Sequence, residues 1–193
     1  NMQFIIKGNC LTEEQAGALS DMFKEADCKL GTIQVEAKKG IENHCRFDGK
    51  ELKVVYTEKV YLFRSIGHLA VSKGKEFEYS ENKPFEKLGT MVDCSRNGVY
   101  TVQALKRLIR YLALCGYNSL HIYTEDTYHI EGEPYFGYLR GAYTKEELKK
   151  LDAYADSYGI ELIPCIQTLA HLSRIFRWKP YSENSLYRRD GAW

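Results

Sequence analysis

The sequence predicts an α/β protein in two parts, a small α+β domain over residues 1–85 and the start of a β/α repeat over residues 86–193. Two observations support this fold class. After residue 87, strand and helix patterns alternate with short joins, which is typical of parallel strands covered by helices. Between the two parts, Asn82-Lys83-Pro84 is a turn-forming cluster of the kind that separates domains.

The composition indicates a globular protein with a core of its own. The 193 residues carry a formal net charge of +1 and 44% of them are apolar, which excludes wholesale disorder. The near-neutral charge gives no reason to expect binding to nucleic acid or to a membrane surface. No apolar run approaches the ~18 residues of a membrane span, and no segment resembles a signal peptide. The six cysteines form no C-x-x-C pair, so we expect reduced thiols, no zinc site and a cytoplasmic location.

Local signals define both helices of the first part. Thr12 begins the first helix, because its hydroxyl can cap the first turn and Gln15 follows three residues later, as in a capping box. The second helix is expected to end near Gly74. Asp48-Gly49 is a hairpin-type turn signal between two strand patterns, which we expect it to join. The expected strands are 3–7, 32–38, 52–57 and 77–79, and the expected helices are 12–26 and 58–72.

In the second part, two amphipathic helix patterns separate three strand patterns. Apolar residues at helical spacing run from Val102 to Leu112 and stop before Gly116. Thr144 begins the next helix, and Glu147 completes a second capping box. A long loop rich in glycine, proline and aromatic residues precedes that helix. The expected strands are 90–93, 119–123 and 160–167, the helices 102–112 and 144–158, and the loop 127–143.

Polar side chains follow all three strand patterns of the second part. Arg96 comes after the first strand, Glu125 and Asp126 come after the second, and His171 comes after the third. Because the carboxyl ends of parallel strands lie at one edge, we expect these four residues to meet at one rim. Both a doubly wound sheet and a (β/α)8 barrel have this geometry. No G-x-G-x-x-G follows a strand, which disfavours nucleotide-binding folds, and we expect no cofactor.

The length of the second part does not suffice for a closed barrel. A complete (β/α)8 barrel takes ~250 residues, whereas residues 86–193 hold three strand–helix units at most. The polar stretch that ends at Trp193 has no pattern that would close a fold. We therefore expect the chain to be a fragment of a longer protein.

Three segments resemble the first three barrel strands of glycoside hydrolase family 20, the exo-β-N-acetylhexosaminidases. They are Met91-Val92-Asp93-Cys94-Ser95-Arg96-Asn97, Tyr123-Thr124-Glu125-Asp126, and the run from Glu161 to His171, and they come in the family's order. Tyr138-Leu139-Arg140-Gly141-Ala142-Tyr143-Thr144 also resembles the second loop of a bacterial branch. The resemblance covers roughly residues 87–180 and implies the first three β/α units of an incomplete (β/α)8 TIM barrel. Residues 1–85 fit the small α+β domain that often precedes the family's barrel.

The resemblance also implies an activity for the parent protein, the removal of a terminal β-linked N-acetylglucosamine or N-acetylgalactosamine from a glycan. Catalysis in the family is substrate-assisted and retaining. The 2-acetamido oxygen of the substrate attacks the anomeric carbon while a glutamate protonates the leaving oxygen. That glutamate follows an aspartate after the fourth barrel strand, in a motif like His-x-Gly-x-Asp-Glu. The present chain has no Asp-Glu dipeptide, so we expect it to be inactive by itself.

The residues that are present match supporting positions of the family. Arg96 matches an arginine that hydrogen-bonds ring hydroxyls of the terminal sugar, a task suited to the fixed donor fork of a guanidinium. His171 matches a histidine near the catalytic glutamate, and Glu125 or Asp126 matches the acidic partner of that histidine. Many members have Arg-Gly where this chain has Leu88-Gly89. The unpaired edge strands of an incomplete barrel further predict self-association.

Two other interpretations remain open from the residues alone. One is a non-catalytic carbohydrate-binding or scaffold protein. The other is an unrelated barrel enzyme that binds a metal through Glu125, Asp126 and His171. For Asp93 we expect a structural hydrogen-bonding role. The aromatic residues of the long loop either stack on sugar rings or pack against their own scaffold, and they are Tyr135, Phe136, Tyr138 and Tyr143.

Overall fold

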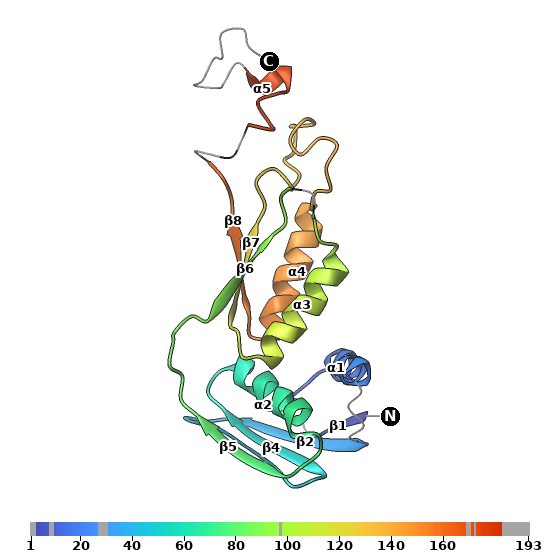
Figure 1. Ribbon diagram of the computed structural model, residues 1–193, viewed down its shortest axis with the longest axis vertical. Coiled ribbons are helices and arrows are strands. Elements are labelled where there is room, and N and C mark those ends of the chain that lie inside the picture. The colour runs from blue at the N-terminus through green and yellow to red at the C-terminus, as the bar shows by residue number, and fades with distance from the viewer. Residues whose placement is uncertain are drawn as a thin grey trace.

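The computed structural model describes residues 3–7, 10–26, 31–96, 98–168, 171 and 173–182. These residues form two sheets with helices packed against them (Figure 1). The first sheet has five strands in the order β1-β2-β4-β3-β5, and the second has three in the order β6-β7-β8. The α/β fold class predicted from the sequence is therefore confirmed.

The first sheet mixes parallel and antiparallel pairs. Strands β1, β2 and β4 are parallel neighbours, whereas β3 runs antiparallel to both β4 and β5. Alternate side chains of the sheet, such as Val35 and Leu52, are fully buried beneath the helices. The strands are β1 (Gln3–Lys7), β2 (Thr32–Lys39), β3 (Asn43–Phe47), β4 (Glu51–Tyr56) and β5 (Phe77–Glu81).

The prediction that Asp48-Gly49 joins the strands at 32–38 and 52–57 is wrong. The turn instead joins β3 to β4, and the Asp48 side chain stabilises it by accepting the amide of Glu51 at 2.8 Å. Strand β3 was not predicted, because only Cys45 and Phe47 in it are apolar. Both are buried. Strands β2 and β4 do lie side by side, but they are parallel.

Helices α1 (Glu13–Glu25) and α2 (Lys59–Ser72) cover one face of the first sheet (Figure 1). The predicted capping box of α1 is present. The Thr12 hydroxyl accepts the amide of Gln15 at 3.1 Å, and the Gln15 side chain accepts the amide of Thr12 at 3.0 Å. Helix α2 ends as predicted, because Lys73 and Gly74 adopt left-handed φ angles of 51° and 83°.

The second sheet consists of the parallel strands β6 (Gly89–Asp93), β7 (Ser119–Tyr123) and β8 (Glu161–Cys165). Helices α3 (Val102–Leu114) and α4 (Lys145–Ser157) lie together on one face of it (Figure 1). Ile122 is buried beneath them, whereas Met91 on the opposite face is 58% exposed. After β8, the described residues include one short helix, α5 (Lys179–Ser182). None of the helices described is long and apolar enough to cross a membrane.

Helices α3 and α4 leave part of their face of the second sheet uncovered. Beside α4, the side chains of β7 and β8 border a groove of about 340 Å3. Most of its lining is apolar: Ile122, Tyr128, Leu148, Leu162, Pro164 and Ile166. Ile166 is 49% exposed, so this face of β8 still has apolar surface open to solvent.

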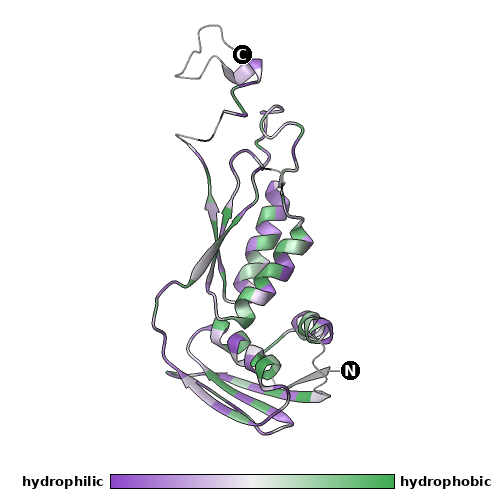
Figure 2. Cartoon of the chain, in the orientation of Figure 1, coloured by the Kyte–Doolittle hydropathy of each residue, from purple (hydrophilic) through white to green (hydrophobic). Residues whose placement is uncertain are grey.

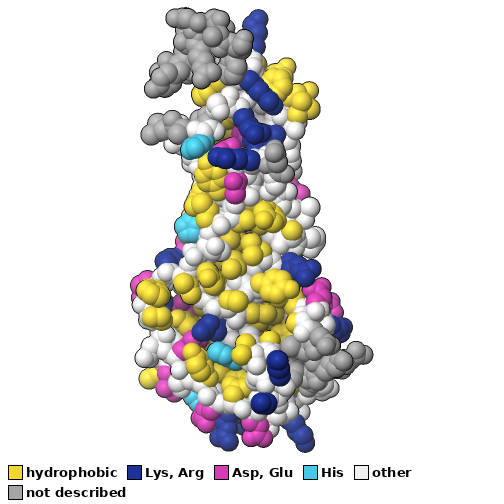
Figure 3. Space-filling view, viewed as in Figure 1, with side chains coloured by type: hydrophobic (Ala, Val, Ile, Leu, Met, Phe, Trp, Pro, Cys, Tyr) yellow, Lys and Arg dark blue, Asp and Glu magenta, His cyan; other side chains and the backbone are white. Residues whose placement is uncertain are grey.

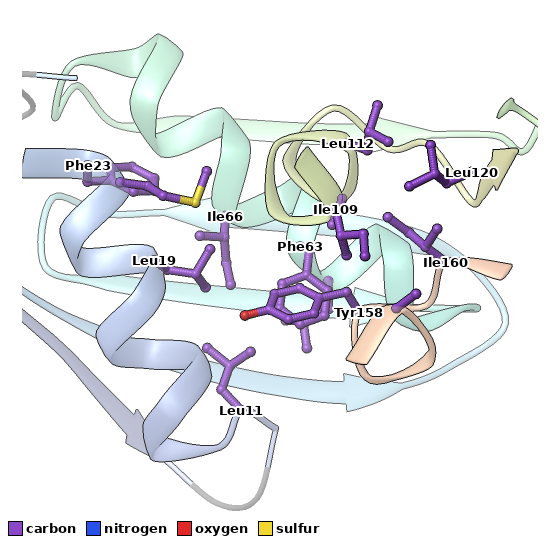
Figure 4. Packing of buried hydrophobic residues seen from close by; sticks show 14 of the residues in the cluster. Leu11, Leu19, Phe23, Phe63, Ile66, Ile109, Leu112, Leu120, Tyr158 and Ile160 are labelled. Atoms are coloured by element: carbon purple, nitrogen blue, oxygen red, sulfur yellow. The ribbon is translucent and has the colours of Figure 1, made fainter. Parts of the chain in front are cut away.

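A continuous hydrophobic core joins the two parts (Figure 4). The rings of Phe63 in α2 and Tyr158 after α4 lie 4.6 Å apart between centroids. At the same junction, Nε2 of Gln15 donates to the main-chain oxygen of Ser157 at 2.9 Å. Figure 2 shows apolar and polar residues alternating along the helices of both parts. The buried residues of both parts thus form one cluster, and the domain boundary between residues 85 and 86 stays a prediction.

Candidate functional site

The carboxyl ends of β6, β7 and β8 form one edge, as predicted, and remain paired beyond their last residues. The amide of Cys94 donates to the Tyr123 oxygen at 2.8 Å, and the amide of Thr124 donates to the Cys165 oxygen at 3.3 Å. We call this edge the rim. Figure 3 shows Lys and Arg side chains with acidic side chains among them at the rim end of the molecule, and further charged side chains around the first sheet.

Two carboxylates are buried at the rim. Glu125 and Asp126 lie two and three residues after the end of β7 and are each 5% exposed. Burial of an ionised carboxylate is costly unless a partner compensates its charge. Arg140 supplies that partner: its Nη1 pairs with Oδ1 of Asp126 and lies 4.0 Å from Oε2 of Glu125. Glu125 also accepts a hydrogen bond from the Tyr123 hydroxyl at 3.3 Å.

Arg140 also contacts the end of β6. Its Nη2 donates to the main-chain oxygen of Arg96 at 3.1 Å. The Arg140 side chain is itself only 7% exposed, and within the described part of the chain its Nε has no hydrogen-bond partner. Sequence reasoning assigned Arg140 no role. The signal that could have found it is the need for a cation beside two adjacent buried carboxylates.

The loop between β7 and α4 folds back so that Arg140 reaches the rim. Thr127 anchors its beginning, since its hydroxyl donates to the Cys94 oxygen at 2.9 Å. Tyr143 anchors its end by donating to the Tyr100 oxygen at 2.7 Å. Gly137 lies so close to the main-chain oxygen of Asp126 that a Cβ would clash, and its φ is 69°.

The aromatic residues of this loop divide into two groups. Tyr143 is buried, and the Phe136 ring packs edge-on against Tyr128 with centroids 4.9 Å apart. Tyr135 and Tyr138 are 40% and 44% exposed, and both contact Trp178, at 5.9 and 5.0 Å between ring centroids. The first group therefore packs against the scaffold, and the second presents aromatic surface to solvent.

Asp93 has a local structural role at the end of β6. Its Oδ1 accepts the amide of Ser95 at 2.8 Å and the hydroxyl of Ser95 at 2.5 Å. These hydrogen bonds favour the ionised form and lower the pKa of Asp93. The expected structural role of Asp93 agrees with these contacts.

The four predicted rim residues do not all meet. The structure brings Glu125 and Asp126 together and ties both, through Arg140, to the main chain at Arg96. The Arg96 residue itself is exposed. His171 is also exposed, has a φ of 60°, and makes no hydrogen bond or ion pair within the described residues. The structure therefore gives no contact between His171 and either carboxylate.

The donor groups at the rim do not form a metal site among the residues described. No set of three or more His, Cys, Asp and Glu side chains comes together there. Glu125 and Asp126 face the Arg140 guanidinium instead. Cys45, Cys94, Cys115 and Cys165 are free thiols, and Cys28 lies outside the described residues.

The fold is similar to solved glycoside hydrolase family 20 enzymes. The exo β-N-acetylglucosaminidase from Vibrio harveyi, in complex with N-acetylglucosamine, aligns with a TM-score of 0.71 and 17% identity, over 98% of this chain and 36% of that one. The β-N-acetylhexosaminidase from Bacteroides fragilis aligns with a TM-score of 0.65 and 18% identity, over 93% of this chain and 44% of that one. The β-N-acetylhexosaminidase from Streptomyces coelicolor A3(2) aligns with a TM-score of 0.64 and 20% identity, over 91% of this chain and 44% of that one. The chain thus spans less than half the length of these structures, and no curated protein matches it.

The sequence also matches the model of a protein family. Residues 85–190, more than half of the chain, match the family described as glycosyl hydrolase family 20, catalytic domain. The matched range contains all three rim strands and the loop that carries Arg140. This agrees with the resemblance of the strand-end motifs and with the fold of the solved structures. The chain belongs to glycoside hydrolase family 20.

Proposed function

We propose that this chain is part of an exo-β-N-acetylhexosaminidase, which removes a terminal β-linked N-acetylglucosamine or N-acetylgalactosamine from a glycan. The observation that carries the proposal is the family match over residues 85–190, which includes the strand ends with their Arg96 and carboxylate motifs. The similar structures from Vibrio harveyi, Bacteroides fragilis and Streptomyces coelicolor bear the names of such enzymes. We also propose a cytoplasmic location, where the six cysteines of the chain would be kept reduced.

In this proposal, the reaction is substrate-assisted and retaining, and it needs no cofactor. Arg96 binds ring hydroxyls of the terminal sugar, and its exposed position leaves it accessible to a ligand. His171, with Glu125 or Asp126 as its acidic partner, supports the catalytic glutamate. In the structure, Glu125 and Asp126 face Arg140 instead of His171. For His171 to pair with one of these carboxylates, either His171 must move or the ion pair with Arg140 must rearrange.

The Asp-Glu pair of the family is not among these 193 residues, so we propose that the chain alone binds sugar without hydrolysing it. The remaining strands of a (β/α)8 barrel would complete the site. In their absence, the free edges of β6 and β8 and the apolar groove beside α4 would favour association of copies of the chain. Light scattering on the purified chain tests this, and a monomer at all concentrations would count against it.

The activity is tested in the full-length protein that contains this chain. We expect it to release 4-nitrophenol from the 4-nitrophenyl β-glycosides of N-acetylglucosamine or N-acetylgalactosamine, with retention of configuration. Arg96→Ala should lower kcat/KM by roughly 10–100-fold, since a hydrogen bond from a charged donor contributes about 1.5–3 kcal/mol. Arg107→Ala is the matched control, because Arg107 lies on α3 and pairs with Glu25.

The proposal fails if the full-length protein hydrolyses neither glycoside, or if Arg96→Ala and Arg107→Ala behave alike. Binding of sugar without any turnover would favour the second candidate function, a non-catalytic carbohydrate-binding protein. The observation that favours this alternative is the pair of exposed rings of Tyr135 and Tyr138 beside the half-buried Trp178, since such rings can stack on sugars.

A further inference from the structure

Arg140 is the point where three separate segments of the rim meet. One guanidinium contacts Asp126 and Glu125 at the end of β7 and the main chain of Arg96 at the end of β6. Arg140 is 14 residues from Asp126 and 44 residues from Arg96 in sequence. The side chain therefore fixes the relative positions of two strand ends from a loop that belongs to neither strand.

The chemistry of these contacts depends on arginine. A guanidinium is planar and always charged, and it offers donors in a fixed fork, so it can bind a carboxylate and a carbonyl oxygen at once. A lysine ammonium could keep the charge beside Asp126, but it lacks the fork. Because the Arg140 and Asp126 side chains are each 7% exposed, water cannot readily replace either partner.

The main chain around these contacts is tightly constrained. Glu125 has a φ of 50°, in the left-handed region that favours glycine. Such a conformation persists in other residues only where the surroundings enforce it, and it is common at functional sites. The close approach of Gly137 to the Asp126 oxygen and the contacts of Arg140 are two such constraints.

We infer that Arg140 is a positioning residue of the sugar-binding site: it sets the orientation of Arg96 by holding the Arg96 main chain against the buried carboxylates of β7. The inference rests on the proposed function. Arg96 is exposed, and no hydrogen bond from its side chain is found among the described residues, so its direction depends on its backbone. Arg140 does not touch the substrate in this scheme and acts through Arg96.

The test is a kinetic comparison in the full-length protein with the 4-nitrophenyl glycoside that the wild-type enzyme prefers. Misplacing Arg96 weakens the binding of ground state and transition state alike, so Arg140→Met should raise KM on the order of tenfold with little change in kcat. A merely structural role would reduce the amount of folded enzyme and leave KM unchanged. Arg107→Met is the matched control and should keep the wild-type KM, because Arg107 is remote from the rim.

A double-mutant cycle tests whether Arg140 acts through Arg96. In an Arg96→Ala background, Arg140→Met should change KM by less than about twofold, because the side chain that it orients is already gone. Arg140→Lys keeps the charge and should fold, yet it should still raise KM, though less than Arg140→Met. An Arg140→Lys enzyme with the wild-type KM overturns the inference even if Arg140→Met yields no folded protein.

The outcomes separate this inference from the proposed function. An active wild-type enzyme whose KM is unaffected by the Arg140 substitutions refutes the inference alone. Additive effects of the Arg96 and Arg140 substitutions refute it as well, because they show independent action. A full-length wild-type protein that hydrolyses neither glycoside refutes the proposed function, and if it also fails to bind N-acetylglucosamine in calorimetry the inference falls with it.

Discussion

Gly67 lies where α2 crosses the end of α3, and it allows the two helices to approach closely. A Cβ added at Gly67 would lie 3.0 Å from the carbonyl carbon of Leu114 and 3.3 Å from its Cα, and nearer still to its oxygen. All three are backbone atoms, so they cannot turn aside as a flexible side chain could. Gly67→Ala therefore forces the helices apart at the junction between the two parts of the chain.

The size of the effect follows from two opposing contributions. Overpacking of a well-packed contact costs about 1–3 kcal/mol. Alanine in a helix interior is more favourable than glycine by about 1 kcal/mol, which offsets part of that cost. Because the clash is with backbone atoms, the cost lies in the upper part of that range, about 2–3 kcal/mol, and we expect Gly67→Ala to lower the free energy of unfolding by roughly 1–2 kcal/mol. For a chain of this size, that corresponds to a decrease in Tm of about 2–8 °C.

Gly17 in α1 provides the matched control, because a Cβ there would meet no atom within 4 Å. Gly17→Ala should therefore raise the free energy of unfolding by about 0.5–1 kcal/mol. Urea titration of the purified chain, followed by far-UV circular dichroism, measures both changes. If Gly67→Ala is as stable as the wild type, or if both alanine variants are stabilised equally, the close contact between α2 and α3 does not require glycine at position 67.

Two further predictions concern the helices. Thr144→Ala removes the hydroxyl that accepts the Glu147 amide at 3.1 Å, and it should lower the free energy of unfolding by about 1 kcal/mol. Thr144→Ser keeps a hydroxyl and should retain most of the stability. Equal losses of stability in urea titrations of the two variants would contradict the capping argument. Burial, with a smaller effect of Arg64, lowers the pKa of His68, whose Nε2 has no partner within the described residues. The pKa of His68 is thus lower in the folded than in the unfolded state, so its contribution to stability is complete above about pH 6.5 and decreases as the pH falls below that value. His68→Gln should therefore flatten the decrease in Tm between about pH 6.5 and 5, and an unchanged pH dependence would refute this assignment.

The helices were predictable because their signals are local. The capping boxes at Thr12 and Thr144 each involve residues three apart, and both form as the sequence indicates. Glycines mark the ends equally well: Gly74, Gly116 and Gly159 all have positive φ angles just beyond a helix. Such contacts lie within one turn, so no knowledge of the rest of the chain is needed to predict them.

The pairing of the first sheet was less predictable because it depends on distant residues. Strand β3 is held between β4 and β5, and only two of its five side chains are apolar. Because the sequence gives no signal for β3, its pattern assigns the turn at Asp48 to β2, whereas β2 pairs with β4 in parallel. The second sheet posed no such difficulty, since its regular alternation of strand and helix permits few other arrangements.

At the site, the sequence predicted which residues stand at the strand ends but not how their charges are compensated. The position of Glu125 and Asp126 follows from the strand pattern alone. Their partner Arg140 lies on a long loop, and the loop's path depends on anchors such as Tyr143, which donates to the Tyr100 oxygen 43 residues earlier in the chain. His171 was expected near the carboxylates, and in the structure it is exposed without such a contact.

The contact between Phe63 and Tyr158 has a consequence for the rim, although it lies far from it. Tyr158 and Gly159 form the turn that leads from α4 into β8, and Gly159 approaches Val60 at the start of α2 so closely that no side chain would fit. The first sheet and its helices thus support the starting ends of β7 and β8, at the opposite end of the second sheet from the rim. Loops at the rim can therefore diverge in sequence without weakening the packing that holds the strands at their other ends.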